Sequence, residues 1–234
     1  MQINGSIALV TGANRGLGRH FARQLLERGA AKVYATARNP EQIDIPGVEK
    51  LRLDITDPGS VEQAAAAASD VTLLINNAGI TTFTNLVNGD LGKIRSELDT
   101  HFWGTLSMVR AFAPVLRANG GGGILNVLSA LSWFSYDGAN AYGVAKAAEW
   151  SLTNGIRLEL AGQGTLVTGL HLGAADTDMM AHYDGDKMDP ADVVRVALDG
   201  IEAGRIEVLA DEWSAYVKAS LANDPSAFYA PTGR

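Results

Sequence analysis

The stretch IALVTGANRGLGRHFARQLLERG, residues 7–29, predicts a strand, a glycine-rich turn and a helix in direct succession. The apolar run at 7–10 is typical of a buried strand. Phe21, Leu25 and Leu26 then recur at helical spacing on one side of the following segment. A buried strand that enters a helix through a glycine turn favours an α/β fold.

The same alternation continues along the chain. Further strands are expected at 32–37, 50–55, 71–76, 123–129, 165–172 and 206–210, with helices at 60–69, about 90–119, about 140–161 and 190–204 between them. Strands that are almost continuously apolar and separated by helices indicate a parallel sheet covered on both faces, with right-handed crossovers. Because no Pro- or Ser-rich linker divides the 234 residues, we expect one domain across 1–234.

Composition limits the classes of function. The chain has 19 basic and 26 acidic residues and a net charge of −7, whereas a nucleic-acid-binding protein usually presents a basic face. It has no cysteine, which excludes disulfides and a thiolate site. The segment at 1–12 lacks a signal-peptide pattern, and no apolar run reaches transmembrane length. We therefore expect a cytoplasmic protein that binds neither nucleic acid nor membrane.

Gly12, Gly16 and Gly18 stand between the first strand and the first helix. Glycines at this point permit a tight turn and let backbone N–H groups approach a pyrophosphate at the helix N-terminus. The spacing is TGxxxGxG rather than GxGxxG, and glycine-rich turns also occur for packing alone. Cofactor binding and a plain turn therefore both remain open from this motif by itself.

The end of the second strand indicates which dinucleotide would bind. An acidic residue about 20 residues past the glycine loop would bind a ribose hydroxyl and repel a 2′-phosphate. Here the segment ATARNP, residues 35–40, carries Arg38 and no carboxylate, and Arg15 lies within the glycine loop. Two guanidinium groups can bind a phosphate, although both could simply be exposed arginines. The pattern favours NADPH over NADH.

Three further motifs follow in order. NNAG at 76–79 comes after the fourth strand, Ser129 follows the fifth, and Tyr142 and Lys146 form a YxxxK pair on a helix. With the glycine loop, these motifs make the chain resemble the classical short-chain dehydrogenase/reductase (SDR) family over nearly its whole length. The resemblance implies a Rossmann-type fold, a doubly wound sheet of seven parallel strands in the order 3-2-1-4-5-6-7, and a homodimer or homotetramer.

The resemblance also implies roles for residues. Tyr142 would be the general acid in reduction and the base in oxidation, Lys146 would hold the nicotinamide ribose and lower the tyrosine pKa, and Ser129 would hydrogen-bond the substrate carbonyl. The expected cofactor contacts are Gly12, Asn14, Arg15, Gly16, Leu17, Gly18, Arg38, Asp54, Ile55, Asn77, Ala78, Gly79, Tyr142, Lys146, Gly173 and Thr177.

Elementary electrostatics agrees with the lysine's role. Lowering a tyrosine pKa from about 10 to about 7 requires about 4 kcal/mol. One ammonium about 4 Å away supplies roughly that much at an effective dielectric constant near 20. Ser129 as a nucleophile is excluded because no G-x-S-x-G motif surrounds it.

Two positions depart from the family pattern. The family's catalytic asparagine in the long fourth helix corresponds to His101, within LDTHFWGTLSM at 98–108. Histidine can donate, accept and carry a proton, so we expect His101 to take the asparagine's place, the alternative being a packed histidine that fills space. After the sixth strand, Leu172 and Gly173 stand where the family often has Pro-Gly, and we expect binding to survive.

The substrate pocket is expected from loops beyond the strand C-termini, including a substrate loop at about 174–190. Its candidate residues are Leu131, Trp133, Phe134, Tyr136, Met179, Met180, His182 and Tyr183, with Thr81 and Phe83 as additions. This set is apolar and aromatic and has no Arg or Lys to bind an anion. It favours a neutral, fairly hydrophobic ketone, aldehyde or secondary alcohol, although aromatic residues on loops also pack against the fold.

The expected function is thus an NADPH-dependent carbonyl reductase or alcohol dehydrogenase acting on a small molecule, with no metal. Two alternatives stay open. One is an NADP(H)-binding sensor of low activity, and the other is a family enzyme of another reaction type, such as a dehydratase or epimerase.

Overall fold

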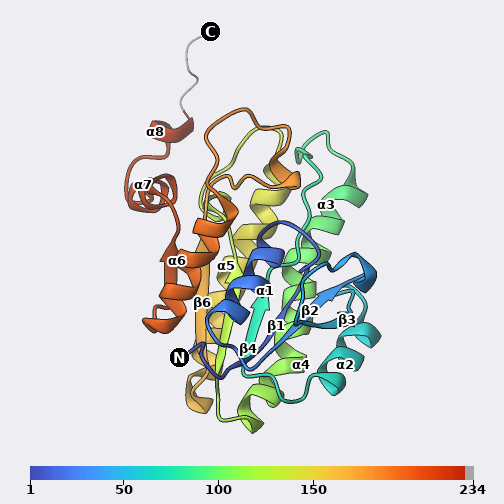
Figure 1. Ribbon diagram of the computed structural model, residues 1–234. Coiled ribbons are helices and arrows are strands. Elements are labelled where there is room, and N and C mark those ends of the chain that lie inside the picture. The colour runs from blue at the N-terminus through green and yellow to red at the C-terminus, as the bar shows by residue number, and fades with distance from the viewer. Residues whose placement is uncertain (230–234) are drawn as a thin grey trace.

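Seven parallel strands form one sheet in the order β3-β2-β1-β4-β5-β6-β7 (Figure 1). The computed structural model describes residues 1–229. The strands are β1 (Ile7–Val10), β2 (Lys32–Ala37), β3 (Glu49–Arg52), β4 (Leu73–Asn76), β5 (Gly123–Val127), β6 (Leu166–His171) and β7 (Glu207–Leu209). Both the predicted strand order and the parallel pairing are confirmed.

Helices cover both faces of this sheet. They are α1 (Gly16–Glu27), α2 (Pro58–Ala67), α3 (Leu91–Leu98), α4 (Thr105–Ala118), α5 (Asn140–Leu160), α6 (Pro190–Glu202), α7 (Glu212–Ser220) and the short α8 (Ser226–Tyr229). In Figure 1, α1 and α6 lie on one side of the strands, with α2, α4 and α5 on the other. No helix within residues 1–229 combines the length and apolarity needed to cross a bilayer.

The strands alternate their side chains between two apolar cores. Ala8 and Val10 of β1 pack with Phe21 of α1 and Val194 of α6, whereas Leu9 belongs to the core formed with α2, α4 and α5. This alternation follows from the period of two along a strand. Because both faces are buried, these strands read as continuous apolar runs in the sequence.

One long predicted helix differs from expectation. The segment expected to be a helix from about 90 to 119 consists of α3 and α4, joined by a π-helical turn at Asp99–Gly104. An i→i+5 turn takes up an extra residue, and such turns are frequent at functional sites. His101 lies in this turn.

The topology also places the site. The chain runs from β1 through β2 to β3 in one direction and from β4 to β7 in the other, so the connections diverge at the β1–β4 boundary. A crevice opens at such a point, at the carboxyl ends of the strands. The glycine loop, the NNAG segment and the loops after β5 and β6 all meet there.

Candidate active site

One large cleft lies at the carboxyl ends of the strands. Its volume is about 2110 Å³, and its walls include the glycine loop, the ends of β2, β4, β5 and β6, and the beginning of α5. A pocket for a single small ligand usually measures roughly 300–1,000 Å³. The cleft can therefore hold a dinucleotide and a second small molecule together.

The glycine loop turns through backbone conformations that favour glycine. Gly12 has φ +66° and Gly16 has φ +52°. Gly18 differs, because a Cβ atom there would lie 2.2 Å from the carbonyl oxygen of Gly12. Gly18 thus lets α1 begin against the loop. Gly18 does not line the cleft, and the structure shows it in contact with the loop instead. Its expected direct contact with the cofactor stays a prediction.

The end of β4 fastens this loop in place. The side-chain amide of Asn77 donates to the Thr11 carbonyl at 2.9 Å, while the backbone N–H groups of Asn77 and Ala78 donate to the Thr11 hydroxyl at 2.9 Å. Thr11 was missed by sequence reasoning, although it directly precedes the first glycine of the motif. This network positions Asn77, Ala78 and Gly79 along the cleft wall.

Arg15 and Arg38, which are expected to bind the 2′-phosphate of NADPH, both line the cleft. The side chain of Arg15 is 68% exposed, and its guanidinium lies 3.7 Å from the carboxylate of Asp178. Burial acts to raise the pKa of Asp54, but hydrogen bonds from Thr56 and the charge of Arg38 outweigh it and lower that pKa. An acidic side chain near Arg38 therefore exists, although it follows β3 rather than β2.

The other predicted cofactor residues are also brought together here. Asn14, Gly16, Leu17, Asp54, Ile55, Asn77, Ala78, Gly79, Tyr142, Lys146, Gly173 and Thr177 all line the cleft. The methyl group of Thr177 would lie 3.5 Å from a Cβ atom built on Gly16, so the loop after β6 meets the glycine loop.

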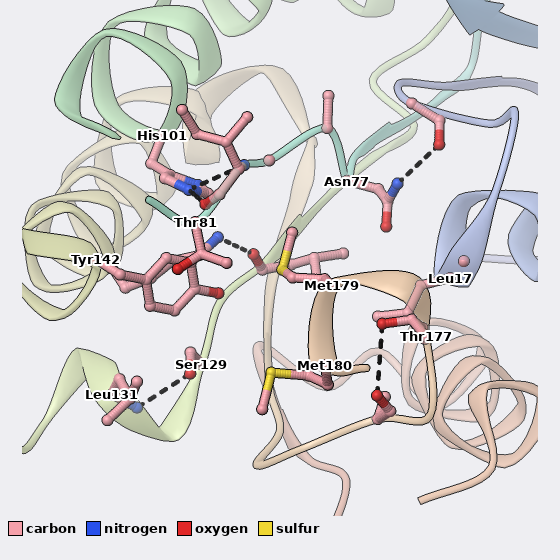
Figure 2. A pocket seen from close by; sticks show the side chains of 18 of the residues that line it. Leu17, Asn77, Thr81, His101, Ser129, Leu131, Tyr142, Thr177, Met179 and Met180 are labelled. Carbon is pink, nitrogen blue, oxygen red and sulfur yellow. Dashed lines mark hydrogen bonds between the residues drawn. The ribbon is translucent and has the colours of Figure 1, made fainter. Parts of the chain in front are cut away.

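The YxxxK residues lie on the first turns of α5 beside the end of β5. In Figure 2, the ring of Tyr142 points toward the same space as Ser129 and Thr81, and Met179 and Met180 face that space from the opposite wall. The Ser129 hydroxyl accepts the N–H of Leu131 at 3.1 Å, which holds it in place. A phenol and a hydroxyl therefore converge on one point of the cleft.

Lys146 is buried behind the phenol. Its ammonium donates to the Val127 carbonyl at 2.7 Å and to a carboxylate oxygen of Glu149 at 2.7 Å, and lies 5.7 Å from the centre of the Tyr142 ring. Burial disfavours the charged lysine, but Glu149 and Tyr142 outweigh it, so the pKa of Lys146 is raised.

The expected effect of Lys146 on the pKa of Tyr142 has the right direction but does not set the net pKa of the free protein. Burial of the phenol raises the pKa of Tyr142, and the nearby charge of Lys146 only partly opposes this rise. Because Glu149 neutralises much of the lysine's effect, a single-ammonium estimate overstates the benefit.

Two buried glutamates were missed by sequence reasoning. Glu149 contacts Lys146, and Glu97 lies 3.5 Å from the Nε2 of His101. The available signal was spacing on a helix: Glu149 follows Lys146 by three residues and Glu97 precedes His101 by four.

The predicted substrate residues mostly lie where expected. Leu131, Phe134, Tyr136, Met179, Met180, His182 and Tyr183 line the cleft, as do Thr81 and Phe83. Trp133 does not: its ring stacks on His171 with centroids 3.8 Å apart, beneath the Lys218 ammonium. Its expected contribution to the pocket is therefore wrong, because the 3-10 turn after Ser129 directs it into the fold.

Two aromatic residues near the C-terminus were missed. Trp213 and Phe228 line the cleft, and Phe134 packs against both, with ring centroids 5.7 Å and 6.1 Å away. Nothing in the local sequence around them indicates that α7 and α8 return to the carboxyl end of the sheet.

The loop after β6 is tied at both ends. Asp176 N–H donates to the Met188 carbonyl and Met188 N–H to the Ala174 carbonyl, both at 2.9 Å. The carboxylate of Asp211 accepts the N–H of Gly173 at 2.6 Å. These bonds restrain the loop although it lacks the proline that the family often has after the sixth strand.

Comparison with known proteins agrees with this architecture. Residues 6–187 match the family model described as short chain dehydrogenase. A short chain dehydrogenase from Burkholderia cenocepacia J2315, solved in complex with NADP, is 39% identical, with a TM-score of 0.94 and 98% of each chain covered.

Two other similar proteins are more distant. An uncharacterized oxidoreductase of Staphylococcus aureus strain MW2 is 30% identical over 210 residues, covering 84% of this chain and 90% of that protein. An SDR from Burkholderia phymatum, solved with NAD, is 22% identical with a TM-score of 0.83, covering 94% of this chain and 93% of that chain, and so indicates the fold alone.

Proposed function

The chain belongs to the short-chain dehydrogenase family of oxidoreductases, and from that premise we propose that it transfers a hydride between NADP(H) and a neutral, fairly hydrophobic ketone, aldehyde or secondary alcohol. One observation carries the proposal: Tyr142 and Ser129 converge on one point of the cleft, with Lys146 behind the phenol. Bound NADPH would supply the hydride, and this chain would supply orientation and the proton.

The tyrosine is suited to proton donation. A phenol is protonated at neutral pH, so Tyr142 can give a proton to the oxygen of a carbonyl as negative charge develops there. Burial raises the pKa of Tyr142 in the free protein and works against this transfer, whereas the charge of Lys146 favours it. The hydroxyl of Ser129 would donate a second hydrogen bond to the same oxygen, and the ammonium of Lys146 would stabilise the tyrosinate that remains.

The cofactor preference rests on the two arginines. Arg15 and Arg38 lie on the wall of the cleft that the glycine loop forms, where a 2′-phosphate could accept charge-assisted hydrogen bonds. The NADP in the 39% identical Burkholderia cenocepacia structure supports this assignment. The positive φ angles of Gly12 and Gly16 provide a cradle that side chains would fill.

The substrate class rests on the lining opposite Tyr142. Phe134, Met180, Trp213 and Phe228 supply apolar surface. Lys187 also lines the cleft, but its ammonium is 3.1 Å from the carboxylate of Asp176, and this pairing weakens any attraction to an anion. We therefore favour an uncharged substrate.

A kinetic panel tests the proposal. NADPH absorbance is followed with uncharged aromatic and aliphatic ketones and aldehydes, and with matched carboxylate-bearing compounds. We expect turnover of the uncharged set that Tyr142→Phe reduces at least about 100-fold while NADPH still binds. NADPH binding with no oxidation on any carbonyl would instead favour a sensor, and turnover without redox change would indicate a dehydratase or epimerase.

We also propose that the protein is a homodimer or homotetramer. Val144 and Leu158 of α5 and Trp103 of the π-helical turn are exposed apolar side chains near α4 and α5. Light scattering during size-exclusion chromatography checks this, and a monomeric mass at micromolar concentration would contradict it.

A further inference from the structure

Four ionisable side chains are packed together behind Tyr142. Lys146 is 4% exposed, Glu149 2%, His101 1% and Glu97 0%. Burying a charge is costly unless a partner neutralises it, so the protonation states of these four groups must be set together. The proposed function uses only Lys146 directly, which leaves three buried groups unexplained.

The four groups form a continuous chain of contacts. The Lys146 ammonium lies 2.7 Å from Oε2 of Glu149, and that same oxygen lies 3.7 Å from Nδ1 of His101. The Nε2 of His101 lies 3.5 Å from Oε2 of Glu97.

Hydrogen bonds hold both carboxylates in place. The Thr105 hydroxyl donates to Glu149 at 3.0 Å, and the Thr82 N–H donates to Glu97 at 2.6 Å. The contact between Lys146 and Glu149 is a hydrogen bond, whereas the two contacts of His101 have ion-pair distances, so proton transfer through His101 requires the ring and the carboxylates to move closer together.

The neighbours of His101 favour one arrangement of its hydrogens. Its Nε2 lies 2.8 Å from the Ile80 carbonyl oxygen, which can only accept, and 3.4 Å from the Ile80 N–H, which can only donate; the shorter contact favours a hydrogen on Nε2. Its Nδ1 is buried, has no hydrogen-bond partner among residues 1–229 and faces Glu149 at 3.7 Å. A nitrogen lone pair aimed at a carboxylate would be repelled, whereas an N–H would be attracted, so a second hydrogen fits this nitrogen.

Charge balance points the same way. The titratable groups facing His101 are Glu97 from α3 and Glu149, Lys146 and Tyr142 from α5. With both glutamates ionised and the phenol neutral, one ammonium leaves a net charge of −1, and an imidazolium would bring the cluster to zero.

The fold makes room for this ring. A Cβ atom on Gly79 would lie 2.7 Å from Cε1 of His101, so the last glycine of NNAG is required for the histidine to fit.

We infer that Glu149, His101 and Glu97 form a proton reserve behind Lys146, in which His101 is held as an imidazolium between two carboxylates. The inference rests on the proposed function and adds positioning residues to it. In reduction, Tyr142 gives a proton to the substrate oxygen, Lys146 returns one to the tyrosinate, and Nδ1–H of His101 restores the lysine by way of Glu149. His101 is left neutral and regains its proton from solvent, so each turnover consumes one proton.

The first test needs no substrate or cofactor. The chain has four histidines, so the ¹⁵N signals of its imidazoles can be assigned by losing one set in His101→Asn. At pH 7 we expect both ring nitrogens of His101 to be protonated in the free protein. We expect Glu149→Gln, which removes the charge but keeps the shape, to leave Nδ1 unprotonated. An unprotonated Nδ1 in the native protein would overturn the inference. This result does not depend on which substrate the enzyme uses or on whether the proposed function is correct.

The second test separates relay from structural support. Glu149→Gln is expected to lower kcat for reduction about tenfold or more, most strongly at high pH where protons are scarce, with the KM for NADPH within about twofold. Glu159→Gln, an exposed carboxylate on the same helix, is the control and should leave both constants unchanged.

Two outcomes of the second test are decisive against the inference. An unchanged pH profile in Glu149→Gln, or a loss confined to KM, would overturn it. If that variant does not fold, the ¹⁵N spectrum of the native protein still decides.

Discussion

Asp211 joins the loop after β6 to the beginning of α7. One carboxylate oxygen accepts the Gly173 N–H at 2.6 Å and the other accepts the Ser214 N–H at 2.6 Å, which caps the helix. The loop that would contact the nicotinamide is thus held by a residue 38 positions later in the chain. The position of Gly173 depends on this carboxylate rather than on the backbone rigidity of a proline.

Replacing Asp211 should therefore weaken cofactor binding as well as stability. Asp211→Ala is expected to cost about 2 kcal/mol of unfolding free energy, because a helix cap and a charge-assisted hydrogen bond are both lost. The Kd for NADPH should also rise several-fold, measured by the quenching of protein fluorescence. Asp189→Ala removes the cap of α6 without touching Gly173 and is the control. Equal cofactor affinity in the two variants would contradict the proposal that Asp211 holds Gly173 in place for cofactor binding.

The arginines should discriminate between the two nicotinamide cofactors. Arg38→Ala and Arg15→Ala are each expected to raise the KM for NADPH about tenfold, the size of one lost charge-assisted interaction. The KM for NADH should stay within about twofold, since NADH has no 2′-phosphate to lose contact with. Parallel titrations with the two cofactors check this, and a proportional loss for both would refute a phosphate site.

Trp133 and Phe134 are neighbours in the sequence with different surroundings. Trp133→Ala removes a ring stacked on His171 and should cost about 3 kcal/mol of unfolding free energy while leaving the ranking of substrates unchanged. Phe134→Ala opens the cleft beside Trp213 and should shift kcat/KM toward bulkier ketones. Urea unfolding and a ketone series of increasing size measure the two effects, and a reversal of their roles would be incompatible with this geometry.

His171 should make the fold sensitive to mild acid. Burial lowers the pKa of His171 from 6.5 to about 4. Between these pH values His171 is protonated in the unfolded chain but not in the folded protein. The free energy of unfolding therefore falls as pH falls, by about 3 kcal/mol over this window. Urea midpoints across this range check the slope. His171→Asn should flatten it, and an identical slope in that variant would exclude His171 as the cause.

Much of the fold could be predicted because its signals are local. The apolar run at 7–10, the glycine loop and the YxxxK spacing depend on neighbours in the chain, and the structure brings the glycine loop and the YxxxK pair to one cleft. The order of the strands followed from the family resemblance and is confirmed.

The rest depended on contacts between distant segments. Phe228 reaches the cleft from the last short helix, and Trp133 turns inward because His171 of β6 offers a surface to stack on. The net pKa of Tyr142 is raised although Lys146 acts to lower it, because burial and Glu149 both act to raise it. A pairwise estimate from spacing contains neither effect.

The π-helical turn at Asp99–Gly104 sets the rotation of α4 about the helix axis relative to α3. Each residue of an α-helix rotates the next by about 100°, so removing one residue from the turn would swing everything after it by that angle relative to what precedes it. Glu97 before the turn and Thr105 after it could then no longer both face α5. The number of residues in this turn therefore decides which side chains of α3 and α4 face α5. A single-residue deletion in the turn would move Glu97 or Thr105 away from the active site even though both residues remain in the sequence.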